Sequence, residues 1–166
     1  MNKIIAIINE LRAYETEREW FEFKVNWFEP AQLGEYISAL SNSAAYAGRK
    51  KAYFIWGINN KTHAIEGTVF DPECEVKNEP LKHFLSRQLS PDINYEFEET
   101  EIEGKRIVAL TIPAAKNIPT SFNRERFIRI GSSKENLLKY PEKESYLFEV
   151  LRHGLPKNQN ICCIIV

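Results

Sequence analysis

The residues best suited to chemistry lie in one short segment, Glu17 to Lys24, which reads Glu-Arg-Glu-Trp-Phe-Glu-Phe-Lys. Alternation with period 2 predicts a strand over residues 20–25 with an apolar core face. The core-facing side chains are Phe21, Phe23 and Val25, and the opposite face carries Trp20, Glu22 and Lys24. Two converging carboxylates can hold a divalent cation, and a lysine beside them can neutralise a phosphate. The alternative is a strand with one solvated face, on which Glu22 and Lys24 form a weak surface pair.

Length and composition indicate one globular domain. The chain has 166 residues, of which 43% are hydrophobic and 12% aromatic, and this is enough for a sizeable core. The net charge of -1 argues against polyanion binding by the whole surface. Any nucleic-acid contact must therefore come from a local basic patch.

The cysteines and the N-terminal apolar run indicate the cellular setting. Cys74, Cys162 and Cys163 are odd in number and two are adjacent, so they make neither a disulfide framework nor a zinc site. This pattern fits a reducing, intracellular environment. The apolar run over residues 4–8 is too short for a transmembrane helix. We therefore expect a cytoplasmic protein without a membrane partner.

The hydrophobic pattern predicts an α+β fold, with a mixed β-sheet of about five to six strands and three to four packing helices. Helices are expected over residues 2–13, 30–46, 78–89 and 141–152. Strands are expected over residues 20–25, 52–58, 64–67, 95–102, 105–112, 120–123 and 124–131. We expect a single domain over residues 1–153 and a tail over 154–166. The tail ends in the form of a prenylation box, although a short edge strand or the end of a truncated longer chain explains it better.

Four segments, in order along the chain, carry a resemblance to a known family. They are residues 17–24 (an acid, four residues, then Glu-Phe-Lys), 37–43 (a helix end with Ala and Asn), 54–60 (a strand ending Gly-hydrophobic-Asn) and 127–132 (Phe-Ile-Arg-Ile-Gly-Ser). Together they resemble the Schlafen-type Alba-like domain, a family described as a DNA-binding domain of bacterial regulators. The resemblance implies an α+β domain in a bacterial transcriptional regulator.

Animal relatives of that family include RNA endonucleases, in which two Glu and one Asp hold a metal ion. The two Glu positions correspond to Glu17 and Glu22, and the Asp position falls on Asn59 or Asn60. Under this alternative Glu17, Glu22 and Lys24 would be catalytic, and Glu17, Glu22 and Asn60 would hold Mg²⁺ or Mn²⁺. An amide still offers an oxygen ligand but removes one negative charge from a cation site, which counts against nuclease activity.

We expect a nucleic-acid-binding module that contacts DNA or RNA mainly through phosphates and requires no cofactor. The candidate contact residues are Lys24, Arg49, Lys50, Lys51, Arg124, Arg126 and Arg129. Trp20, Trp56 and Phe127 could stack bases, although core packing suits Trp56 better. The first alternative is a Mg- or Mn-dependent endoribonuclease that cleaves tRNA or rRNA, so enzymatic activity stays open. The second is a non-catalytic oligomerisation or protein-interaction domain, with a homodimer as the simplest partner.

Overall fold

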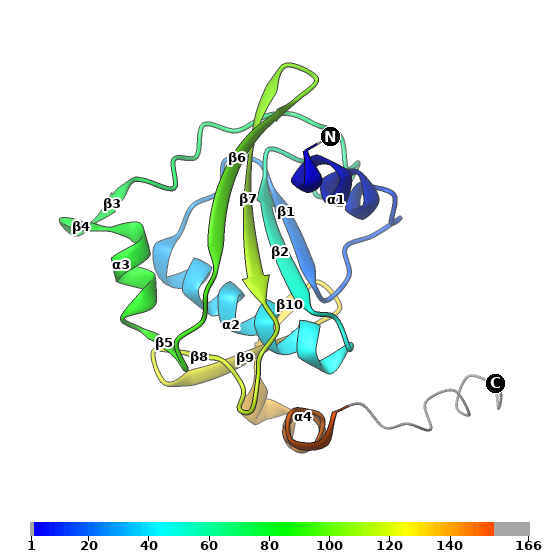
Figure 1. Cartoon of the computed structure of the whole chain (residues 1–166), viewed down its shortest axis with the longest axis vertical. Coiled ribbons are helices and arrows are strands. Elements are labelled where there is room, and N and C mark those ends of the chain that lie inside the picture. The colour runs from blue at the N-terminus through cyan, green and yellow to red at the C-terminus, as the bar shows by residue number, and fades with distance from the viewer. Residues whose placement is uncertain (1, 155–166) are drawn as a thin grey trace.

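The computed structural model describes residues 2–154, and it has the predicted α+β architecture (Figure 1). The helices are α1 (Lys3–Arg12), α2 (Pro30–Tyr46), α3 (Leu81–Ser86) and α4 (Pro141–His153), with a 3-10 turn η1 (Leu137–Lys139). The strands are β1 (Phe21–Lys24), β2 (Lys51–Trp56), β3 (Glu75–Val76), β4 (Glu79–Pro80), β5 (Leu89–Ser90), β6 (Glu96–Ile102), β7 (Lys105–Pro113), β8 (Ser121–Phe122), β9 (Glu125–Ile130) and β10 (Ser133–Asn136). Of the tail predicted over residues 154–166, residues 155–166, with Cys162 and Cys163, lie outside the described residues.

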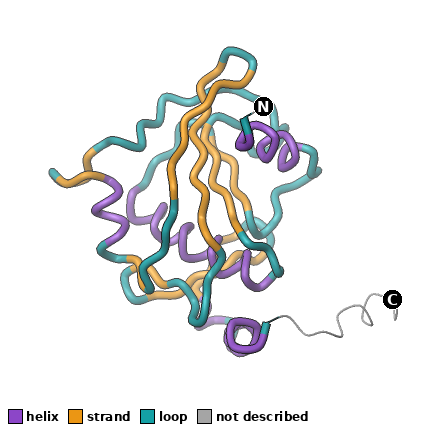
Figure 2. The backbone as a smooth tube through the Cα atoms, in the orientation of Figure 1, coloured by secondary structure: helices purple, strands orange, loops and turns teal. Residues whose placement is uncertain are grey.

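The strands form two four-stranded sheets and one short pair (Figure 2). The first sheet has the order β1-β2-β7-β6, in which β1 and β2 are parallel and the other pairs antiparallel. The second sheet has the order β10-β9-β8-β5 and is antiparallel throughout. The β6–β7 hairpin turns at Glu103 and Gly104, whose φ angles of 54° and 73° are those of a type I′ turn. Its two strands agree with those predicted over residues 95–102 and 105–112.

Helix α1 covers one face of the first sheet. Its buried residues Ile4, Ile8 and Leu11 recur at helical spacing, and they pack on Phe21 and Phe23 of β1. Both phenylalanines are fully buried, as their strand pattern predicted. None of the helices within residues 2–154 is long and apolar enough to cross a membrane.

Helix α2 covers the other face and is buried by both sheets. Its apolar residues Leu33, Ile37 and Leu40 pack with Phe54 and Trp56 of the first sheet. At Gly34 the helix meets β8 so closely that a Cβ atom would lie 2.1 Å from the Phe122 ring. A glycine is therefore required where the second sheet crosses this helix.

The side of α2 that faces the second sheet is polar yet buried. Asn42 donates to the carbonyl oxygens of Thr120 and Phe127, both at 2.9 Å, and accepts from the Thr120 amide at 2.7 Å. Ser38 donates to Thr120 and accepts from the Phe127 amide, and Ser43 accepts from the Arg129 amide at 2.9 Å. Along β9, strand β8 pairs only with Glu125 and Arg126. The contacts from α2 supply hydrogen-bond partners to Phe127 and Arg129, which lie beyond the end of β8, and they hold the second sheet on the helix.

Three sequence predictions need correction. The strand expected over residues 64–67 is reduced to one bridge between Ile58 and Ile65. The helix expected over 78–89 shortens to α3, because Glu79 and Pro80 pair with β3 and Leu89 pairs with β8. Strand β10 was not predicted, since Ser133–Asn136 has no apolar alternation and is a strand through its pairing with β9. In each case the hydrogen-bond pairing that forms in the fold, and not local propensity, decides whether the segment is a strand.

Asn42→Ala tests the role of the polar helix face. We expect a loss of about 2–4 kcal/mol of unfolding free energy, because the buried Thr120 amide and two carbonyl groups lose their partner. Urea unfolding would measure it. Asn60→Ala, at an exposed turn position, is the matched control and should change stability by less than about 0.5 kcal/mol. Equal stability of the two variants would contradict this account.

Candidate nucleic-acid interface

Strand β1 has no solvated face. Glu22 pairs in register with Phe54 and Lys24 with Trp56, and both aromatic residues belong to the core beneath α2. Glu22 is consequently buried, with 3% of its surface exposed. The alternative of a weak surface pair between Glu22 and Lys24 is therefore wrong, because α2 and the second sheet cover this side of the strand.

Glu17, in the segment before β1, lies beside that strand and next to Glu22. One carboxylate oxygen accepts from the Phe23 backbone amide at 2.5 Å, and the side chain is 7% exposed. Burial, followed by the hydrogen bond to Glu22 and its charge, raises the pKa of Glu17 to about 8. At neutral pH Glu17 therefore keeps its proton.

Arg129 reaches this pair from β9. Its Nη2 atom lies 3.7 Å from Glu22 and 4.0 Å from Glu17, and its side chain is fully buried. The sequence predicted a phosphate contact for Arg129, and this prediction needs correction because the guanidinium points into the interior. None of its three nitrogen atoms has a hydrogen-bond partner among the described residues.

Tyr36 lies next to the acidic pair, and two lysines lie near its ring. Burial, with the charge of Glu22, raises the pKa of Tyr36 to about 12, so the phenol stays neutral and hydrogen-bonds to Glu22. Lys24 and Lys134 lie 6.0 and 5.2 Å from the Tyr36 ring centre, and Lys134 also pairs with Glu35. Neither Tyr36 nor Lys134 was singled out in the sequence, because both come from segments distant from the acidic motif.

The residues do not fit a divalent metal ion. Asn60 is exposed in the turn after β2, and His63 of the same loop contacts the Arg12 carbonyl and the Phe23 ring on the α1 side of the sheet. The structure thus places Asn60 away from the acidic pair, and the Asn59 side chain already accepts from Lys61 and Thr62 amides. Within residues 2–154 no three His, Cys, Asp or Glu residues are grouped to hold a metal. The Arg129 guanidinium lies beside both carboxyl groups and occupies the position that a metal ion would need.

The remaining basic candidates divide into two regions. Arg49, Lys50 and Lys51 are exposed where α2 passes into β2, and the Arg49 guanidinium lies 4.6 Å from the Trp20 ring centre. Arg124 and Arg126 belong to the second sheet: Arg124 is exposed in the β8–β9 turn, and Arg126 lies 3.6 Å from Glu144. The sequence could not show this separation, since it depends on how the sheets are placed.

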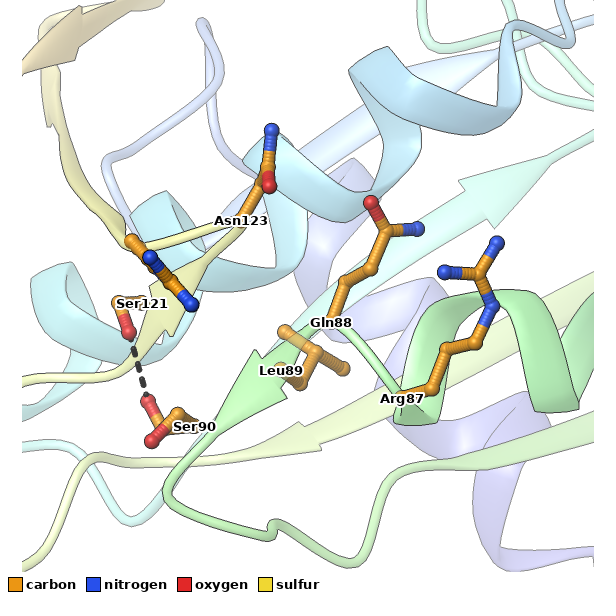
Figure 3. Close-up of a pocket in the computed structure, with 7 residues that line it drawn as sticks. Arg87, Gln88, Leu89, Ser90, Ser121 and Asn123 are labelled. Atoms are coloured by element: carbon orange, nitrogen blue, oxygen red, sulfur yellow. Dashed lines mark hydrogen bonds between the residues drawn. The ribbon is translucent and has the colours of Figure 1, made fainter.

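The second region surrounds a pocket of about 610 Å³ between β5 and the β8–β9 turn (Figure 3). Its lining residues are Arg87, Gln88, Leu89, Ser90, Ser121, Asn123 and Arg124, and none of them carries a carboxylate. A neighbouring hollow of about 250 Å³ shares Ser90, Ser121 and Arg124 and adds Arg126. We call the larger one the arginine pocket. Arg87 and the pocket itself were missed in the sequence, because β5 and β8 are brought together only by folding.

A family model described as Schlafen, AlbA_2 matches residues 17–138. The chain belongs to this family. The matched range contains the acidic pair, Arg129 and every lining residue of the arginine pocket, so the Schlafen resemblance seen in the sequence is confirmed. No curated protein matches the chain.

Two solved structures are similar to this Schlafen AlbA_2 domain. The DIP2311 protein from Corynebacterium diphtheriae shows 17% identity and a TM-score of 0.50, covering 81% of this chain and 26% of that chain. The N-terminal domain of an ATP-dependent DNA helicase RecG-related protein from Nitrosomonas europaea shows 20% identity and a TM-score of 0.48, covering 81% of this chain and 93% of that chain. The chain thus spans about a quarter of the DIP2311 protein, and at this identity the likeness shows the fold alone.

The raised pKa of Glu17 predicts a pH-dependent stability. Between its ordinary pKa of 4.5 and the folded value of about 8, the unfolded chain has lost a proton that the folded domain keeps. Unfolding free energy should therefore fall as pH rises through this window and level off above it. Glu17→Gln, which cannot ionise, should show a smaller fall between pH 5 and pH 8 in urea unfolding.

Glu98→Gln is the matched control for this measurement, because Glu98 is exposed on β6. It should follow the pH dependence of the unaltered domain. If Glu17→Gln shows the same fall as Glu98→Gln, the proton is not held by the acidic pair.

Proposed function

We propose that this Schlafen AlbA_2 domain binds nucleic acid, mainly through phosphate contacts at the arginine pocket. The observation that supports it is the lining itself, in which two guanidinium groups stand beside two hydroxyls and two amides without any carboxylate. Arginine offers a planar fork of donors that matches phosphate oxygens, and neutral hydroxyl and amide donors commonly complete such contacts.

Arg124 is the principal contact residue under this proposal. It is exposed in the two-residue turn with Asn123, and no carboxylate of the described residues lies within 4.0 Å of its guanidinium. Arg87 is partly neutralised by Glu79 at 2.8 Å and Arg126 by Glu144 at 3.6 Å. The charge of Arg124 is therefore the one most available to a ligand, in a domain whose net charge is -1.

The basic group of Arg49, Lys50 and Lys51 would form a second contact region. It lies beyond the C-terminal end of α2, whereas the pocket lies beside Phe122, which packs on Gly34 near the helix start. A helix rises about 1.5 Å per residue, so the two regions are separated by roughly 20 Å. A short nucleotide would reach one of them, and a longer strand both.

Fluorescence anisotropy with labelled single-stranded, duplex and tRNA-like probes, at two salt concentrations, tests the proposal. Affinity should fall as salt rises, and Arg124→Ala should weaken binding several-fold and reduce the salt slope by about 1. Lys61→Ala, an exposed lysine in the turn after β2, is the control and should bind as the unaltered domain does. Absence of binding, with a stable dimer in light scattering, would favour the interaction-domain alternative and contradict the proposal.

The ribonuclease alternative is tested on the same samples with and without Mn²⁺, run on a denaturing gel. We expect binding without cleavage, because Arg129 neutralises the acidic pair and Asn60 lies elsewhere. Cleavage that persists in Glu22→Gln would belong to a contaminant. Cleavage that disappears in Glu22→Gln would show a nuclease and overturn this expectation.

A further inference from the structure

We infer that the arginine pocket takes one unpaired nucleotide of a single-stranded nucleic acid, with its phosphate at Arg124 and its base beside Gln88 and Asn123. This rests on the proposed function and goes further, because phosphate contacts alone do not distinguish a single strand from a duplex. The inference adds the residues that contact the base and the single-stranded form of the ligand.

The first argument is size. The pocket holds about 610 Å³, within the range of sites that enclose a small organic ligand. A duplex keeps its bases stacked inside and presents its phosphates on the outside, so it would contact the rim without filling the pocket. An unpaired nucleotide can turn its base into a concave site.

The second argument is the chemistry of the wall. Gln88 donates from its amide nitrogen to the Phe84 carbonyl at 3.0 Å, which leaves its amide oxygen as an acceptor. Asn123 bonds to another residue within 2–154 through its backbone N–H and not through its side-chain amide, and in Figure 3 that side chain extends in the same direction as the Gln88 side chain. Amide groups, with one acceptor and two donors each, suit the hydrogen-bonding edge of a base.

The third argument is that the pocket is already formed. Leu89 pairs in register with Phe122 and Ser90 with Ser121, and the Ser121 hydroxyl donates to the Ser90 carbonyl at 3.1 Å. The backbone N–H of Asn123 donates to the backbone carbonyl of Gln88 at 2.9 Å, which holds these two residues together. A ligand would therefore meet a wall of paired strands and would order few residues on binding.

The test compares a labelled single strand with the duplex of the same sequence, in the full-length chain. Asn123→Gly removes the amide while keeping a residue that tolerates the φ of 50° at this position, and Gln88→Met removes the other amide at similar length. Each should weaken single-strand binding about tenfold and leave duplex binding unchanged. Arg124→Ala should weaken both, and Lys61→Ala neither; thermal unfolding confirms that each variant is folded.

Nucleoside monophosphates added as competitors distinguish the source of the nucleotide. Displacement of the single strand at millimolar monophosphate, together with the amide-variant effect, supports the inference. Monophosphate binding without any strand binding would overturn it in favour of a free-nucleotide site. Equal affinity for single strand and duplex, lost in Arg124→Ala but not in the amide variants, would overturn the inference and leave the phosphate-binding proposal standing. Absence of binding to every probe would contradict both the inference and the proposed function.

Discussion

The structure depends on one constraint: α2 is enclosed by two sheets, so its polar side must find hydrogen-bond partners within the protein. Asn42, Ser38 and Ser43 meet this requirement with the backbone of residue 120 and of β9. Those bonds determine where the second sheet lies. That placement in turn brings Arg129 against the acidic pair and positions β8 beside β5, where the two strands form one wall of the arginine pocket.

The acidic pair and Arg129 form one buried unit. The raised pKa keeps Glu17 protonated near neutral pH, and the positive guanidinium lies within 4.0 Å of both carboxyl groups. Burying such groups costs desolvation energy that their attraction offsets only in part. The unit therefore accounts for the position of β9 relative to β1 more than for the stability of the fold. In any other position of β9, Arg129 would be displaced and two carboxyl groups would be buried without a cation.

Periodicity was enough to predict the helices that became α1, α2 and α4, and the two strands of the β6–β7 hairpin. It was not enough for the site. Alternation in β1 assigned Glu22 to one face of the strand, but it could not show that α2 covers that face. The cluster of small polar residues Ser38, Ser41, Asn42 and Ser43 in the second half of α2 was the available signal of burial on both sides. No pattern along the chain could have joined Arg87 to Arg124, since strand pairing across the fold brings them to one pocket.

The proton held between Glu17 and Glu22 has a consequence for calorimetry. Near neutral pH the folded domain keeps this proton, and the unfolded chain, with a carboxyl pKa of 4.5, releases it to the solvent. The heat absorbed on melting then contains the heat with which the buffer takes up that proton. The apparent enthalpy of the transition is thus partly a property of the buffer, and values obtained in phosphate and in an amine buffer describe different overall reactions.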